Sequence, residues 1–162
     1  HVTQTTLYGY LKTRIGVKYI AMMEDERFLK SINIAKWNIY MVALADCAFY
    51  VFSYLISEKN LKQNDCKEVF LSIIEKERKN GLSEEIYNNG KLNFLKRIEK
   101  INFNQYHLGD PFKESGEALY YWSPIADELK TLDKKIVLNS ISLKWGLAKN
   151  EFKKLIKNLN FD

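Results

Sequence analysis

Residues 39–56 form an apolar run that only Asp46 and Ser53 interrupt, and no other stretch of the chain resembles it. A helix that is apolar on every side must be surrounded, either by protein in a helical bundle or by lipid in a membrane. The run predicts a helix from about Ile34 to Glu58, roughly 37 Å long at ~1.5 Å per residue.

The chain before this run carries a second helical pattern. Leu7 and Leu11 recur at helical spacing, which predicts a helix over residues 3–15, and Gly16 is the kind of residue that ends one. The acidic triplet at 24–26 predicts the start of a separate short helix, because acidic residues favour the exposed N–H groups of a helix N-terminus.

The middle of the chain has two helix-start signals. Asp65, with an acidic residue three positions later, predicts a helix over 66–79. Ser83 predicts a short capped turn that the Asn-Asn-Gly sequence at 88–90 ends, and a further helix is expected from residue 91 onwards.

The last third of the chain predicts two more helices. A turn at 109–111 precedes a helix over about 114–122, and the Ser123-Pro124 pair has the residues that begin a helix. The final helix, near 134–159, has apolar residues at alternating steps of three and four. These residues are Leu138, Ile141, Trp145, Ala148, Phe152, Leu155 and Leu159.

Together these patterns predict an all-α fold, a single-domain helical bundle covering residues 1–162. We expect about six to eight helices around the apolar helix at 34–58, with the helix near 134–159 packed against it. The composition agrees: the chain has two prolines and seven glycines, few for a protein built from β-hairpins, and 46% hydrophobic residues, enough for a core.

Asp46 indicates whether the apolar helix lies in a bilayer or in a protein core. A charged side chain near the centre of a membrane span costs about 2.5–3.5 kcal/mol, and the amphipathic helices elsewhere need a surface to pack on. The sequence therefore favours a soluble core helix, with no membrane span. No signal peptide is recognised and both cysteines are read as reduced, which predicts a cytoplasmic location, although His1 is not a natural start.

Asp46 is also the most informative single side chain, because a buried carboxylate needs a partner or a raised pKa. One hypothesis is an internal ligand-binding site formed by Asp46, Tyr50, Ser53 and Tyr54. The alternative is a structural bond from Asp46 to a backbone N–H, Arg14 or Trp37, and buried carboxylates are usually satisfied in this way.

The sequence predicts no metal site, no cofactor and no catalytic residues. His1 and His107 are the only histidines, neither stands in a metal-binding motif, and the two cysteines lack zinc-ligand spacing. The common nucleophile-elbow, phosphate-loop and dinucleotide motifs are absent from the sequence. His107 lies near Asp110 in a turn and is interpreted as a loop residue.

Charge is concentrated in the last part of the chain. Residues 130–162 hold eight lysines and three acidic residues, so this segment carries 8 − 3 = +5, equal to the net charge of the whole chain. Lys149, Lys153, Lys154 and Lys157 are the predicted partner-binding residues. Contact of these lysines with the phosphates of RNA or DNA is an alternative that we do not favour.

The favoured function is a non-enzymatic helical interaction module, an adapter or assembly factor with a protein partner. The first alternative is a small-molecule or hydrophobic-ligand binder, or an enzyme, with an internal polar site around Asp46. The second alternative is an RNA- or DNA-binding protein that uses the basic C-terminal helix. No oligomeric state follows from the sequence.

Overall fold

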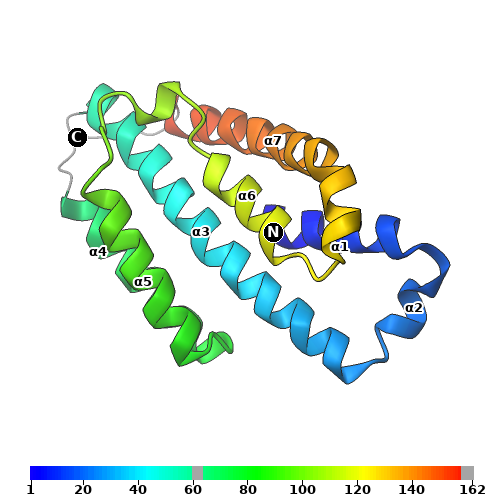
Figure 1. Cartoon of the computed structure of the whole chain (residues 1–162). Coiled ribbons are helices and arrows are strands. Elements are labelled where there is room, and N and C mark those ends of the chain that lie inside the picture. Colours follow the sequence, from blue (N-terminus) through cyan, green and yellow to red (C-terminus); the bar gives the residue numbers. More distant parts are fainter. Residues whose placement is uncertain (60–63, 158–162) are drawn as a thin grey trace. The chain divides into compact units, whose positions relative to one another are not determined.

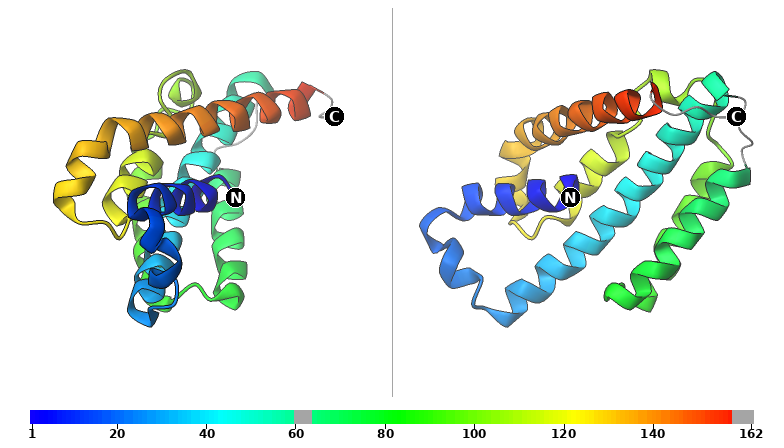
Figure 2. Two further views of the ribbon diagram at one scale, coloured as in Figure 1. Left: turned by 90° about the vertical axis from the view of Figure 1, so that its right-hand side faces the viewer. Right: turned by 180° about the vertical axis from the view of Figure 1, so that it is seen from behind.

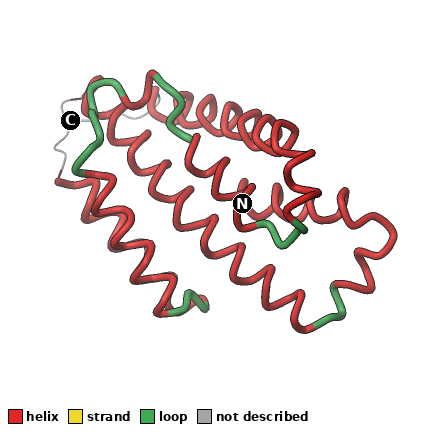
Figure 3. Tube along the Cα trace, viewed as in Figure 1, coloured by secondary structure: helices red, strands yellow, loops and turns green. Residues whose placement is uncertain are grey.

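The computed structural model describes residues 1–59 and 64–157, and within these ranges it contains helices, turns and loops but no β-strand (Figure 3). The prediction of an all-α fold built on a long apolar helix is confirmed. The helices, labelled in Figure 1, are α1 (Val2–Ile15), α2 (Tyr19–Met22), α3 (Glu26–Lys59), α4 (Asn64–Glu77), α5 (Glu84–Ile98), α6 (Lys113–Trp122) and α7 (Asp127–Lys157). Short 3₁₀ turns occupy Gly16–Lys18, Arg78–Asn80 and Tyr106–Leu108.

The contacts divide the chain into two compact units. One unit combines residues 1–36 with the chain from 116 onwards, and the other comprises residues 37–115. The divisions fall inside α3 and α6, so each of these helices contributes to both units. The single-domain organisation and the packing of the last helix against the apolar helix stay predictions.

The apolar helix starts earlier than expected. The acidic residues at 24–26 do mark a helix start, but the helix they begin is α3 itself, so the prediction of a separate short helix is wrong. Asp25 caps it: one carboxylate oxygen accepts the N–H groups of Arg27 at 2.8 Å and Phe28 at 3.1 Å. These bonds satisfy two of the N–H groups that a helix start leaves unpaired.

The predicted stop at 88–90 is also wrong, since α5 runs through it. Ser83 caps α5 as expected by accepting the Ile86 N–H at 3.4 Å. Gly90 allows close packing: a Cβ there would lie 2.3 Å from the Met41 methyl carbon and 3.2 Å from two further Met41 carbons. A side chain at position 90 would therefore force the Met41 side chain on α3 to move.

Ser123 ends a helix instead of beginning one. Its buried hydroxyl donates to the Leu119 carbonyl oxygen at 2.6 Å, at the end of α6, and α7 begins only at Asp127. The predicted N-cap is therefore wrong. The link between the two helices is held by Lys130, whose ammonium donates to the Tyr121 carbonyl oxygen at 3.0 Å.

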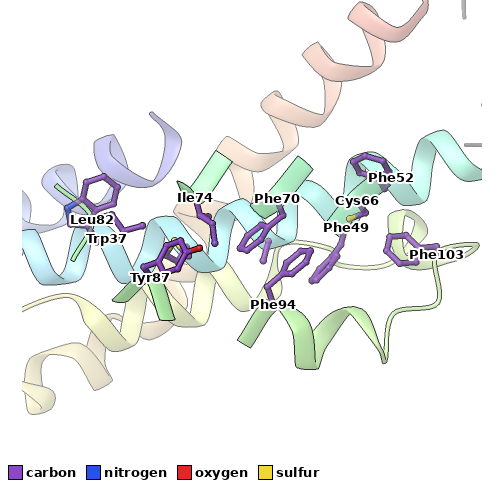
Figure 4. Close-up of a cluster of buried hydrophobic side chains, with 12 residues drawn as sticks. Trp37, Phe49, Phe52, Cys66, Phe70, Ile74, Leu82, Tyr87, Phe94 and Phe103 are labelled. Carbon is purple, nitrogen blue, oxygen red and sulfur yellow. The ribbon is translucent and has the colours of Figure 1, made fainter. Parts of the chain in front are cut away.

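The core of unit 37–115 is aromatic. The C-terminal part of α3 lies beside α4 and α5 (Figures 1 and 2), and each of the three helices contributes one ring to a stack (Figure 4). The Phe70 and Phe94 rings are 3.8 Å apart and nearly parallel, and the Phe49 ring lies 5.0 Å from Phe94 on a similar plane. Buried aromatic side chains stabilise such a core through their large apolar area.

In the other unit, α7 packs on α1. Asp133 on α7 accepts a hydrogen bond from the Tyr10 hydroxyl on α1 at 3.1 Å and forms an ion pair with Arg14 Nε, also on α1, at 3.1 Å. Ile141 and Trp145 are buried, as their helical spacing predicts. The same spacing fails at Leu155, which is exposed, and Leu159 lies outside the described residues.

Candidate functional site

Asp46 is fully buried and has a partner for each carboxylate oxygen. One oxygen accepts from the Arg97 guanidinium on α5, and the other accepts the Ser115 N–H at 2.8 Å. Of the structural partners considered for Asp46, a backbone N–H is present, while Arg14 pairs with Asp133 instead. Arg97 was not foreseen, because it lies 51 positions away in the sequence.

Opposing effects act on the Asp46 carboxyl. Burial raises its pKa above the ordinary value, because a charge is poorly solvated in the core. The positive charge of Arg97 and the hydrogen bonds from Arg97 and Ser115 act in the opposite direction. The Arg97 guanidinium also lies 5.1 Å from the centre of the Phe49 ring, which favours the cation further.

Ser53, also fully buried, fixes the segment that follows α5. Its Oγ lies 2.6 Å from the Phe103 carbonyl oxygen, 3.0 Å from the His107 backbone nitrogen and 2.8 Å from His107 Nδ1. A hydroxyl has one hydrogen to donate and two lone pairs. The carbonyl takes the hydrogen and the backbone N–H takes one lone pair, so His107 Nδ1 must carry a proton and donate to the other.

Tyr50 and Tyr54 face the same segment. The Tyr54 ring lies 5.8 Å from the His107 ring, edge to face, and the Tyr50 ring lies 5.5 Å from the Phe112 ring. The face of α3 predicted to bind a ligand therefore contacts residues 103–115 of the same chain. The ligand-binding role of these residues stays a prediction, and their observed contacts are structural.

Neither cysteine is placed for chemistry. Cys47 and Cys66 are free thiols, and burial raises the pKa of each to about 12. Across residues 1–59 and 64–157, no group of three or more histidine, cysteine, aspartate or glutamate side chains is arranged to hold a metal ion.

The apolar helix passes a length and composition test for a membrane span. The segment Glu26–Glu58 is the one such helix in the part of the chain that the structure describes. Its most apolar window is 56% buried by protein, and the core helix of a soluble protein passes the same test. Length and composition alone therefore do not assign it to a bilayer.

Three of the four predicted partner-binding lysines lie together near the end of α7. Lys153, Lys154 and Lys157 line a shallow surface depression of about 360 Å³ with Leu147, Asn150 and Glu151. Lys154 pairs with Glu151 at 2.7 Å. Lys149 is half-buried and does not line the depression.

An exposed apolar line along α7 is the feature that the sequence reading missed. We call it the α7 stripe, and it consists of Leu129, Leu132, Ile136, Leu143 and Leu147. The last four of these side chains are 62% to 75% exposed. At ~100° per residue the five positions fall within about 60° of one another, roughly 140° around the helix from the buried side chains.

The signal for this stripe was present in the sequence. The helix has two apolar lines at helical spacing, and the predicted buried face follows only the one through Ile141 and Trp145. A sequence pattern shows that two faces are apolar, but only packing shows which one is covered.

Comparisons with protein-family models, curated proteins and solved structures found no match to this chain.

Proposed function

We propose that this protein is a non-enzymatic helical interaction module, an adapter or assembly factor that binds an amphipathic helix of a protein partner. The observation that supports the proposal is the α7 stripe. Large exposed side chains aligned on one face of a helix are typical of a surface that is covered in a complex, whereas scattered ones need no explanation.

The surroundings of the stripe suit a helix. Small polar side chains flank it at Asn139, Ser140 and Ser142, so a second helix can approach closely. The lysines at 153, 154 and 157 lie beyond its C-terminal end and favour a partner with acidic residues there. The alternative of an internal ligand site has less support, because its predicted face contacts residues 103–115 of the chain.

Site-specific photo-crosslinking tests the proposal. A benzophenone amino acid replaces Leu143 in the stripe or, as the matched control, Thr131, which is exposed on α7 about 120° away from Leu143 around the helix. We expect irradiation in cells to join the Leu143 variant, and not the control, to a polypeptide. Equal crosslinking at both positions, or none at either, contradicts the proposal.

A salt titration distinguishes the proposed protein-binding function from the nucleic-acid-binding alternative. Contacts to phosphates release counterions, so binding of single-stranded RNA or DNA through the lysines weakens steeply as salt rises. We expect no such binding, and no change when Lys153 and Lys157 are replaced by Gln. Tight, steeply salt-dependent binding that the double replacement removes would favour the nucleic-acid function instead.

A further inference from the structure

Four of the five residues of the α7 stripe, all except Leu129, have the same spacing when they are read in either direction. Leu132 and Ile136 are four residues apart, as are Leu143 and Leu147, and the polar pair at 139–140 lies midway between them. A twofold axis maps a surface onto itself, so it requires this mirrored spacing. Binding to an unrelated partner helix would not require mirrored spacing.

The mirrored spacing defines an antiparallel pairing of two copies of α7. With the axis at 139–140, Leu132 lies opposite Leu147 of the second copy and Ile136 lies opposite its Leu143, and each contact occurs twice. The polar side chains of Asn139 and Ser140 meet at the centre, where a polar residue fixes the register of paired helices.

The charges beside the stripe favour the same orientation. Glu128, in the first turn of α7, and Lys153, near its end, lie on the same side of the stripe at ~100° per residue. Antiparallel pairing brings Glu128 close to Lys153 of the second copy and puts Lys135 beside the neutral Ser142. A parallel pairing would instead bring the lysine-rich ends together, which like-charge repulsion disfavours.

We propose that the α7 stripe is the interface of a symmetric antiparallel dimer of this chain, so that the helix bound by each copy is α7 of the other. This inference rests on the proposed function and names its partner. The stripe is about 27 Å long from Leu129 to Leu147, which is short for a stable interface, so the dimer is weak and depends on concentration.

Sedimentation over a concentration series tests for the dimer. We expect the native chain to shift from monomer to dimer as its concentration rises, and a variant with Ile136→Glu and Leu143→Glu to stay monomeric. Both side chains are about 70% exposed, so the variant should keep its helical content and melting temperature. The matched control, Val17→Glu with Ile20→Glu, changes exposed apolar residues off the stripe and should dimerise normally.

A charge exchange tests the orientation. Glu128→Lys should weaken the dimer about five-fold, because it removes two attractive pairs per dimer. Adding Lys153→Glu recreates both pairs with reversed signs and should restore the native dissociation constant. If the second change weakens the dimer further, the antiparallel arrangement is wrong.

Disulfide trapping gives an independent measure of the register. Chains carrying Leu132→Cys and chains carrying Leu147→Cys are mixed and oxidised mildly, and the native chain reports any background from Cys47 and Cys66. We expect mixed crosslinks well in excess of those within either population. A preference for joining Leu132→Cys to itself indicates parallel pairing and overturns the inference.

The crosslinking at position 143 separates this inference from the proposed function. A product with twice the mass of the chain supports both. A product with a different polypeptide, together with a native chain that stays monomeric at the highest concentration, supports the interaction module and overturns the self-pairing. Absence of any product contradicts both.

Discussion

Arg97 on α5 donates a hydrogen bond to Asp46 on α3, and the pair joins the two helices inside a core whose other contacts are largely aromatic. Asp46 is fully buried and the Arg97 side chain is only 19% exposed. A buried ion pair is costly to desolvate, yet removing one member leaves the other charge without compensation. The free energy of unfolding should therefore depend on both residues together.

Replacing Asp46 by Ala should lower the free energy of unfolding by about 3 kcal/mol, because Arg97 then holds an unpaired charge in the core. Combining Asp46→Asn with Arg97→Met removes both charges and keeps an oxygen that can accept the Ser115 N–H. We expect the double variant to be more stable than Asp46→Ala. Urea unfolding monitored by circular dichroism measures both values.

Arg78→Met is the control for loss of an ion pair at the surface. Arg78 pairs with Glu75 and Glu84 in an exposed position, where solvent screens the charges, so its effect should be much smaller. Equal losses for Asp46→Ala and Arg78→Met would show that burial does not set the importance of the Asp46 pair.

Ser53→Ala should free the segment after α5. The change removes the hydrogen that Phe103 accepts and the oxygen that the His107 N–H requires, at a cost of about 2 kcal/mol. Amide hydrogen exchange should show faster exchange at the His107 N–H than in the native chain. Ser57→Ala is the matched control, since Ser57 reaches the same segment through one exposed bond of 3.4 Å to Asn104.

If exchange at His107 stays slow in Ser53→Ala, the segment is held by its aromatic contacts and not by the serine. A fast rate in both variants would show that any loss on this face of α3 releases the segment.

Gly90→Ala and Gly9→Ala should have opposite effects. Alanine is the better helix former by about 1 kcal/mol, and a Cβ at Gly9 meets nothing within 4 Å, so Gly9→Ala should raise the free energy of unfolding. At Gly90 the Cβ would overlap the Met41 side chain, which must then move. Gly90→Ala should therefore lower the free energy of unfolding by about 1 kcal/mol net. Thermal unfolding of both variants gives the comparison.

Adding Met41→Ala to Gly90→Ala provides the internal check. If the clash causes the loss at Gly90, this second change should cost less in the Gly90→Ala chain than in the native chain. Strictly additive losses would mean that the two side chains do not meet.

The two thiols should resist modification in the folded protein. With a pKa of about 12, each is a thiolate in roughly one molecule in ten thousand at pH 8, against about one in ten for an ordinary cysteine with a pKa of 9.0. A thiol-reactive dye should therefore label Cys47 and Cys66 about a thousand-fold more slowly in buffer than in denaturant. Rapid labelling of the folded chain would contradict their burial.

The raised thiol pKa also sets a direction for alkaline stability. In the unfolded chain the thiols lose their protons near pH 9, whereas in the folded chain they keep them to about pH 12. The folded state then binds more protons, so the free energy of unfolding must fall as the pH rises above 9. Replacing the less buried Cys47 by Ala should reduce this slope in urea titrations at several pH values.

The sequence by itself determined the fold class and most of the helices. Spacing over 3–15 and the long run at 39–56 identified α1 and α3, because a helix that buries one face needs apolar residues at a fixed period. Local signals were less reliable where tertiary contacts changed their meaning. Gly90 looked like a stop and proved to be a close contact with Met41, and Ser123 looked like a start and proved to end α6.

Only the tertiary structure decided what Asp46 touches and which face of α7 is open. The Asp46 partner lies 51 positions away on α5, and no local pattern specifies a contact at that separation. The sequence of α7 contains two apolar lines. The line through Ile141 is buried because it packs on α1 and α6, whereas the α7 stripe is exposed. Periodicity records that a face is apolar, whereas coverage of that face depends on the arrangement of the helices around it.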